Sequence, residues 1–256
     1  MNMPGAVNMP ENAPTTEAAR VTELLPRTLA EADVSTAEGR AWLEAVYSPA
    51  PVNRVRLNMI TSLTGSAVGS DGTSETLTSP VDRAILGIIR GAADVVLVGA
   101  STVRAEGYLA PRTAALAIVT TTGRLDGHRL GAEAGRVGRI LLVCPAGRES
   151  TVVAERDAQG IDAEVIAVPG EADLEPRAIL DALGAHGLER VVCEGGPTLA
   201  SRFVEARAID ELCVTVAPVI GPAPSPFIRI QNGAQASMHG MLVDGAGFSY
   251  LRLRRS

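Results

Sequence analysis

Residues 191–199 read Val-Val-Cys-Glu-Gly-Gly-Pro-Thr-Leu, and this stretch is the strongest indication of the fold. An apolar run ends in an acid, two glycines turn the chain, and a proline opens a helix. The unpaired N–H groups of a first helical turn, with the helix dipole behind them, bind anions. In open α/β sheets, ligands also bind beyond the carboxyl ends of the strands. We therefore expect a nucleotide site at Gly195 and Gly196, with a plain tight turn as the alternative.

Strand-like runs alternate with helical patterns on both sides of this stretch, which is typical of an α/β fold. Residues 1–51 are expected to form an N-terminal arm. Its first eighteen residues look disordered, and the remainder contains short amphipathic pieces able to pack on a core. Residues 52–256 are expected to form one domain. The predicted strands are 54–60, 94–98, 115–120, 139–144, 163–168, 190–194 and 212–218, with a closing antiparallel pair at 241–243 and 249–253; the predicted helices are 80–92, 148–159, 175–186 and 197–206.

The helix predicted at 80–92 has a recognisable start. Ser79 supplies an N-cap hydroxyl, Pro80 suits the first turn, and Asp82 adds an acid there. Arg90 lies away from the apolar stripe of this helix. It either projects toward a pocket or is solvated near the helix end.

Composition narrows the classes of function. The 256 residues carry a net charge of −6, which argues against a nucleic-acid binder, since that class usually has a basic face. All 23 basic residues are arginine, so any phosphate must be held by arginines, hydroxyls or backbone N–H groups. No C-x-x-C or H-x-E pattern predicts a metal site, and Cys144, Cys193 and Cys213 are expected in the core. No signal peptide or membrane-spanning run is visible, so we expect a cytoplasmic protein.

Two further strand ends carry hydroxyls and arginines. Gly99 is followed by Ser101, Thr102 and Arg104, and residues 120–124 read Thr-Thr-Thr-Gly-Arg. Three hydroxyls and an arginine after a strand suit a 2′-phosphate, which favours NADPH over NADH. Each turn is weak evidence alone, because Thr and Gly are common in turns. The G-x-G-x-x-G fingerprint is missing, which disfavours a standard Rossmann domain.

Five blocks follow one another from about Val52 to the C-terminus, at residues 61–65, 73–83, 93–104, 194–199 and 210–221. Together they resemble the reductase domain of the riboflavin-biosynthesis deaminase/reductase family. Thr64 stands where the family has an aspartate, and Asn58 where many members have a lysine. No deaminase motif is visible, so we expect no second activity. The blocks are 61–65 (family S-L-D-G), 73–83 (G-x-S…I-T-S…x-R), 93–104 (A-D…V-G-x-x-T-V), 194–199 (E-G-G-x-x-L) and 210–221 (D-E-L…A-P…G).

This resemblance implies a dihydrofolate-reductase-like, three-layer α/β fold with a mostly parallel central sheet and C-terminal antiparallel strands. It also implies a homodimer formed through those strands, and NADPH-dependent reduction of a phosphoribosylamino-pyrimidine to its ribitylamino form. Glu194 would orient the pyrimidine and is the candidate catalytic residue. The implied substrate residues are Ser74, Arg90, Arg112 and Glu194. The implied cofactor residues are Thr61, Thr76, Thr102, Glu106, Thr122, Gly195, Gly196, Pro197, Thr198, Leu199 and Arg202.

Several alternatives stay open at this point. A reductase of the same fold could act on a dihydropterin, and Thr64 motivates a paralogue that binds NADPH without catalysis. A transferase that binds a sugar nucleotide is a less favoured alternative, since the sequence has no P-loop or metal-carboxylate cluster. Glu194 itself could simply pair with a structural arginine. The three histidines lie in loop or helix-end contexts and are assigned no catalytic role.

Overall fold

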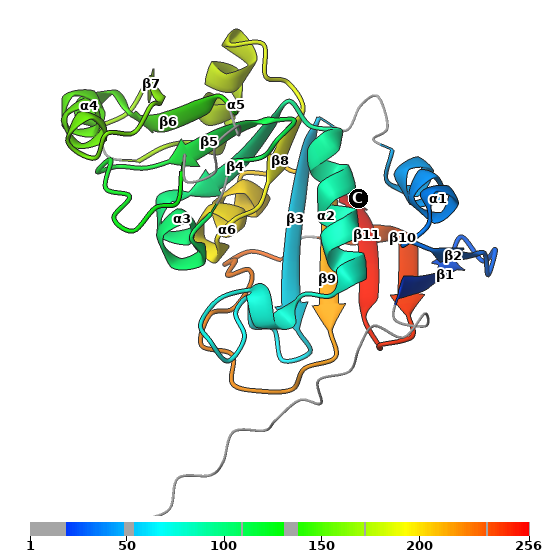
Figure 1. Cartoon of the computed structure of the whole chain (residues 1–256). Coiled ribbons are helices and arrows are strands. Elements are labelled where there is room, and N and C mark those ends of the chain that lie inside the picture. The colour runs from blue at the N-terminus through cyan, green and yellow to red at the C-terminus, as the bar shows by residue number, and fades with distance from the viewer. Residues whose placement is uncertain are drawn as a thin grey trace, which may run out of the picture.

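A computed structural model of the chain describes residues 19–48, 54–108, 110–130, 138–171, 173–233 and 235–255, which form one sheet covered by helices (Figure 1). The strand order is β2-β1-β10-β11-β9-β3-β8-β4-β5-β6-β7. Neighbours from β9 to β7 pair in parallel, and those from β2 to β9 pair antiparallel. The strands are β1 (Arg20–Leu25), β2 (Glu31–Asp33), β3 (Val55–Ser62), β4 (Val95–Gly99), β5 (Ala115–Val119), β6 (Ile140–Pro145), β7 (Glu164–Val168), β8 (Val191–Cys193), β9 (Glu211–Ala217), β10 (Ala236–Asp244) and β11 (Ser249–Arg255).

Helices cover both faces of this sheet. On one face, α5 (Pro176–Ala185) and α6 (Pro197–Glu205) pack on alternate residues such as Leu57 and Leu97. On the other face, α3 (Ala100–Glu106) and α4 (Glu149–Ala158) cover Val96 and Val98, while α1 (Ala37–Tyr47) and α2 (Pro80–Gly91) cover Val192. The α2 ribbon crosses in front of the sheet in Figure 1. The predicted three-layer α/β fold with a mostly parallel sheet is confirmed.

Every strand and helix predicted between residues 54 and 253 is present, with ends shifted by a few residues. The N-cap of α2 is also confirmed, since the Ser79 Oγ accepts a hydrogen bond from the Asp82 N–H at 3.1 Å. Among the strands and α-helices of the described residues, β1, β2, α1 and α3 were not predicted, and neither were the short 3-10 helices η2 (Glu75–Leu77) and η3 (Ala146–Arg148). They are short or weakly patterned, and tertiary packing rather than local preference stabilises such elements.

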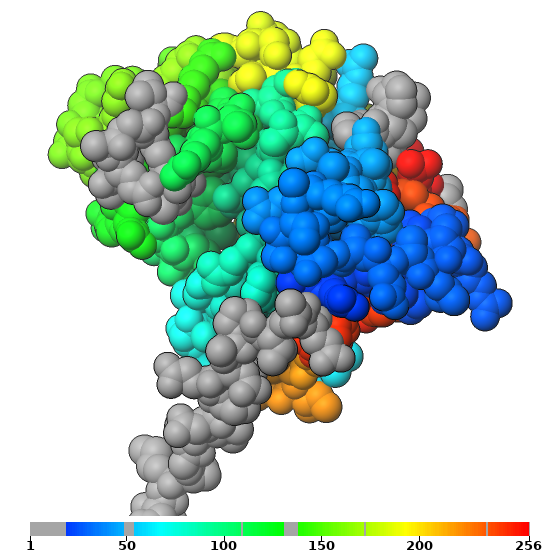
Figure 2. Space-filling view, turned by 45° about the vertical axis from the view of Figure 1, so that its right-hand side comes forward, coloured from blue at the N-terminus to red at the C-terminus, as the bar shows by residue number. Residues whose placement is uncertain are grey.

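Residues 19–48 belong to the same sheet as the rest of the chain. β1 pairs with β10 from Val21 to Leu25, and α1 packs against α2. Figure 2 shows this segment (blue) lying directly against the α2 region. The outer edge of β10 is therefore occupied by the chain itself. The expected disorder of residues 1–18 lies outside the described residues, and the homodimer stays a prediction.

Buried apolar side chains fill both faces of the sheet. Cys144, Cys193 and Cys213 are buried and free, as predicted for core positions, and burial raises the pKa of the Cys144 thiol to about 11. Within the described ranges, no helix combines the length and the apolar character needed to cross a bilayer.

A charged cluster is buried where β3, β9 and β11 meet. Glu211 is inaccessible to solvent; its carboxylate accepts from Arg56 Nε at 2.6 Å and from Arg252 Nη2 at 2.7 Å, and His239 Nε2 lies 2.9 Å away. Burial works to raise the pKa of Glu211, but the charges of Arg56 and Arg252 outweigh it and hold that pKa below its usual range. Burial, reinforced by the charges of Arg252 and Arg254, lowers the pKa of His239.

Acid should therefore weaken this cluster. The folded pKa of Glu211 lies below its unfolded value, so its stabilisation is lost as the pH falls through the folded value. The folded pKa of His239 is also lowered, so the unfolded chain takes up that proton first, and stability falls below about pH 6.5. We expect the free energy of unfolding to decline from pH 7 to pH 5. His239→Gln, which keeps an N–H donor, should flatten that decline in urea titrations at fixed ionic strength; an unchanged slope would contradict this reading.

Candidate active site

The candidate site lies at the carboxyl edge of the parallel strands. β3, β8, β4 and β5 are consecutive neighbours in the sheet and run in the same direction. Their last residues, Ser62, Cys193, Gly99 and Val119, consequently end at one edge. The three strand-to-turn junctions singled out in the sequence follow three of these strands. The fold brings them together as predicted.

The turn after β8 forms a narrow backbone cradle. The Gly195–Gly196 peptide is cis, and Gly195 has a φ of +82°, a region that strongly favours glycine. The Gly195 carbonyl accepts from the Gly99 N–H at 2.8 Å, which joins the ends of β8 and β4. A Cβ added at Gly196 would lie 2.6 Å from the Thr102 Oγ1. Any larger residue at 196 must therefore push into this turn.

Thr102 contacts the cradle directly. Its Oγ1 accepts a hydrogen bond from the Gly196 N–H at 2.8 Å. The side chain thus holds the first turn of α3 against the cradle. Thr102 supports the shape of the cradle through Gly196 and still has its hydroxyl proton to donate, so its implied contact with a cofactor stays a prediction.

Arg90 and Glu194 form the central ion pair of the site. Arg90 Nε donates to Glu194 Oε1, and Arg90 Nη2 to Oε2, both at 2.7 Å. The Glu194 side chain is 7% exposed and that of Arg90 24%. Burial works to lower the pKa of Arg90, but the hydrogen bonds and charge of Glu194 raise it above its usual value. The solvated reading of Arg90 is wrong, and both predicted substrate residues lie together.

Tyr108 completes this pair, and sequence reasoning missed it. Its hydroxyl donates to Glu194 Oε2 and accepts from Arg90 Nη2 at 2.5 Å, while the guanidinium carbon of Arg90 lies 5.2 Å from its ring centroid. Tyr108 directly follows Gly107, the left-handed C-cap of α3. The resemblance placed the Gly107–Arg112 loop on the substrate side, but it did not single out Tyr108, and an aromatic residue after a glycine is usually a core residue.

Ser74 and Glu106 also contact each other. The Ser74 backbone N–H donates to Glu106 Oε1 at 3.0 Å, and its hydroxyl lies 3.1 Å from Oε2. The resemblance implies that Ser74 binds the substrate and that Glu106 binds the cofactor. Their contact ties the loop between β3 and α2 to the end of α3.

The remaining predicted residues are spread more widely. Thr61 is buried in β3, and Thr76 is exposed and bonded to Asp71 within its own loop. Thr122 is exposed just beyond β5, and Arg202 sits one turn into α6, 3.4 Å from Asp173. Arg112 is exposed and precedes β5, so it lies at the amino end of that strand, opposite the carboxyl edge. Its role with the substrate phosphate stays a prediction.

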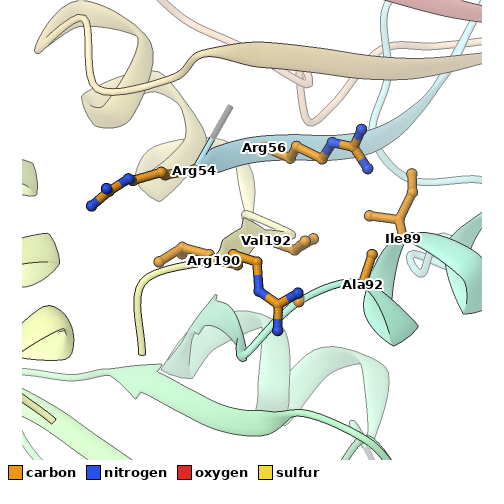
Figure 3. Close-up of a pocket in the computed structure, with 8 residues that line it drawn as sticks. Arg54, Arg56, Ile89, Ala92, Arg190 and Val192 are labelled. Carbon is orange, nitrogen blue, oxygen red and sulfur yellow. The ribbon is translucent and has the colours of Figure 1, made fainter. Parts of the chain in front are cut away.

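Two hollows lie at that opposite, amino edge. Figure 3 shows the smaller one, of about 10 Å³, beside Arg56, Arg190 and the end of α2. The larger one, of about 530 Å³, is lined by Arg54, Arg177 and other residues of α5 and β3. Neither includes a residue predicted for catalysis or cofactor binding. The chemistry points instead to the carboxyl edge, where the convergent polar groups lie.

The residues of the cradle fit an anionic dinucleotide. Pro197 has no N–H, and no side chain in the described part of the chain caps α6 at Gly196. The first-turn N–H groups of Thr198 and Leu199 thus have no side-chain acceptor and suit a phosphate oxygen. Gly195 and Gly196 present bare backbone there. The predicted cofactor turn therefore has the shape and donors that a pyrophosphate needs.

Comparison with known proteins gives the family. The family model described as the RibD C-terminal domain matches residues 53–238. Riboflavin biosynthesis protein RibD of Mycobacterium tuberculosis is 32% identical over 192 residues, which cover 72% of this chain and 47% of that protein. The chain thus spans about half the length of the curated relatives it matches.

Solved structures share the fold. A pyrimidine reductase-like protein of Corynebacterium diphtheriae has a TM-score of 0.70 at 24% identity, covering 84% of this chain and 98% of its own. Riboflavin Biosynthesis Reductase Rib7 of Saccharomyces cerevisiae has a TM-score of 0.61 at 16% identity, covering 83% and 94%. With the Gly195–Gly196 cradle in place and the family match extending over residues 53–238, this chain belongs to the RibD C-terminal domain family.

Proposed function

We propose that this protein is an NADPH-dependent reductase of a riboflavin-pathway pyrimidine, which converts a phosphoribosylamino group into a ribitylamino group. The observation that carries the proposal is the cradle after β8, which adjoins the Arg90–Glu194 pair at the same strand end. An anion site and a polar, half-buried recognition pair thus lie side by side. Hydride transfer needs such a neighbourhood, because the two reactants must be held in contact with water excluded.

NADPH would lie on the cradle, with its pyrophosphate on the N-terminus of α6. When bound, it supplies the hydride. Gly196 keeps the approach open, and Thr102 fixes the Gly196 N–H. Thr198 and Leu199 offer backbone donors, and Arg202 adds a positive charge further along α6.

The preference for NADPH over NADH is supported by the turn after β5. Arg104 Nη1 donates to the Arg124 carbonyl at 2.7 Å, so two arginines of α3 and this turn lie together. Arg124 also pairs with Asp126 at the exposed surface. Thr121 and Thr122 are exposed beside them. Arginines with hydroxyls are the expected partners of a 2′-phosphate in a chain without lysine.

The substrate side would be built from Ser74, Arg90 and Glu194. Glu194 is almost fully buried and ion-paired, so it would orient a heterocycle through hydrogen bonds. Ser74 lies in the loop between β3 and α2, where Glu106 at the end of α3 accepts hydrogen bonds from it. A dihydropterin would find the same pair of groups, and the turnover assay below distinguishes the two heterocycles.

Thr64 favours a second candidate, a protein that binds NADPH without catalysis. The Thr64 Oγ1 donates to the Gly221 carbonyl at 2.7 Å and lies 3.0 Å from the Ser62 Oγ. This side chain therefore ties the end of β3 to the segment after β9. It offers no carboxylate where related reductases are expected to have one.

Titration of the purified protein with NADPH and with NADH, followed by the 340 nm assay with 5-amino-6-(5-phosphoribosylamino)uracil, tests the proposal. We expect tighter binding of NADPH and turnover. Binding without oxidation of NADPH by the uracil compound or a dihydropterin would support the second candidate. No binding of either dinucleotide at millimolar concentration would refute both.

Arg90→Lys should raise the KM for the uracil compound by roughly tenfold or more, because lysine replaces a two-pronged contact with a point charge. The Kd for NADPH should stay within about twofold, since Arg90 bonds to Glu194 and not to the Gly195–Gly196 cradle. Arg83→Lys is the matched control. It lies on the same helix, is exposed, and pairs with Glu75 outside the site. A parallel loss of NADPH affinity in Arg90→Lys would show that the pair serves only the fold.

A further inference from the structure

The Tyr108 hydroxyl completes a closed set of hydrogen bonds with Arg90 and Glu194. Arg90 Nη2 donates both to Glu194 Oε2 at 2.7 Å and to the Tyr108 oxygen at 2.5 Å. The Tyr108 proton goes to the same Oε2. Nε of Arg90 is bonded to Oε1, so Nη1 is the only nitrogen of this guanidinium without a partner among the described residues. The recognition pair is thus already occupied by a group of the protein.

The occupying group has a particular donor and acceptor pattern. A phenol hydroxyl donates one hydrogen bond and accepts another. Here it donates to a carboxylate and accepts from a guanidinium. An amide edge, –NH–C(=O)–, presents the same two functions side by side. A heterocycle with such an edge therefore makes the same pair of bonds that Tyr108 makes.

We propose that Tyr108 is an internal stand-in for the amide edge of the ligand, which displaces its hydroxyl on binding to Arg90 and Glu194. This inference rests on the proposed function, because a pyrimidine such as an aminouracil carries that edge. The Tyr108 hydroxyl keeps two charged groups satisfied while the site is free of ligand. Without it, a half-buried guanidinium and a buried carboxylate would lose a partner each.

The position of the ring permits the exchange. Tyr108 is only partly buried, and one backbone hydrogen bond, from its N–H to the Val103 carbonyl at 3.3 Å, links it to α3. Its ring packs at the edge of the cluster formed by α3, α4 and β4–β6. Rotation of the side chain moves the hydroxyl without breaking any strand or helix.

In the wild-type protein the ligand must compete with the Tyr108 hydroxyl for its hydrogen-bond partners, and Tyr108→Phe removes this competition. In the variant, no hydroxyl competes for Arg90 and Glu194. We expect the Kd of 5-amino-6-(5-phosphoribosylamino)uracil for the NADP⁺-loaded protein to fall by about tenfold, as for the loss of one competing hydrogen bond to a charged group. A uracil ligand methylated at both ring nitrogens has no ring N–H beside a carbonyl, so its Kd should change by less than about twofold. Calorimetric titration measures both values.

Thermal unfolding gives an independent readout. Tyr108→Phe should lower the Tm of the ligand-free protein, and saturation with the uracil compound should abolish that difference, because ligand binding and the hydroxyl then satisfy the same groups. Tyr47→Phe is the matched control. Tyr47 is the last residue of α1 and its side chain is buried in the core, so the affinity of this variant for the ligand should equal that of the wild type.

The outcomes separate this inference from the proposed function. Normal NADPH binding with an unchanged or weaker Kd for the uracil compound in Tyr108→Phe would overturn the inference alone, as would a Tm deficit that persists at ligand saturation. Absence of NADPH binding in the wild type and in both variants would overturn the proposed function and this inference with it.

Discussion

Gly196→Val should weaken NADPH binding on the order of 100-fold, a loss of about 2.7 kcal/mol of binding free energy. The added Cβ would lie 2.6 Å from the Thr102 Oγ1, which itself holds the Gly196 N–H. Valine would therefore displace Thr102 and fill the space that a pyrophosphate needs. The expected cost to stability is smaller, about 1 kcal/mol or a Tm decrease of about 2–4 °C.

Gly184→Val is the matched control for this prediction. Gly184 lies near the end of α5, and a Cβ there meets no atom within 4 Å. Its NADPH affinity should match that of the wild type in a fluorescence titration. Comparable losses of binding and of unfolding free energy in Gly196→Val would indicate that this glycine serves only the fold.

Glu211→Gln should lower the free energy of unfolding by about 3–5 kcal/mol, which is the usual cost of removing one partner from a buried ion pair. The variant keeps the shape of the side chain but leaves Arg56 and Arg252 without a counter-charge. Arg56 is 3% exposed, and its two outer nitrogens already have no partner in the described part of the chain. Such a loss corresponds to a Tm decrease of roughly 6–20 °C.

Glu164→Gln provides the comparison for Glu211. Its carboxylate pairs with Arg139 at 2.8 Å, but both side chains are about 45% exposed, so at most about 1 kcal/mol should be lost. Urea unfolding at pH 7 measures both variants. A loss below about 1 kcal/mol in Glu211→Gln would mean that water compensates the buried arginines.

The sequence was sufficient for the parallel half of the sheet. The strands from β3 to β9 are short apolar runs bounded by turn residues, and α2 carries a complete N-cap signal at Ser79. These signals depend only on neighbouring residues, so they can be recognised in the sequence without knowledge of the fold. In the segment 19–48, α1 has such a signal in its N-cap Thr36, which the prediction did not include, whereas β1 and β2 have no comparable signal. β1 becomes a strand because β10 supplies its hydrogen-bonding partner, more than two hundred residues away in the sequence.

Some of the recognised blocks proved to serve the fold at the amino edge. Asp94 accepts from the backbone N–H groups of Glu189 and Arg190, which joins β4 to β8. Asp210 does the same for Arg54 and Val55, at 3.0 and 2.9 Å. A motif by itself does not tell a structural acid from a functional one. The two kinds of acid differ in position: Asp94 and Asp210 lie at the amino ends of their strands, whereas Glu194 follows the carboxyl end of β8.

The sequence by itself determined the succession of strands and helices along the chain from β3 to β11 except for α3, the glycine turn after β8, and the supply of arginines and hydroxyls at the strand ends. These follow from periodicity and from the conformational freedom of glycine, both of which are properties of neighbouring residues. The tertiary structure alone decided that Tyr108 would bond to Arg90 and Glu194, that Thr102 would hold Gly196, and that Glu211 would collect two arginines. Each of these contacts joins residues far apart in the chain, and no local pattern encodes the distance between them.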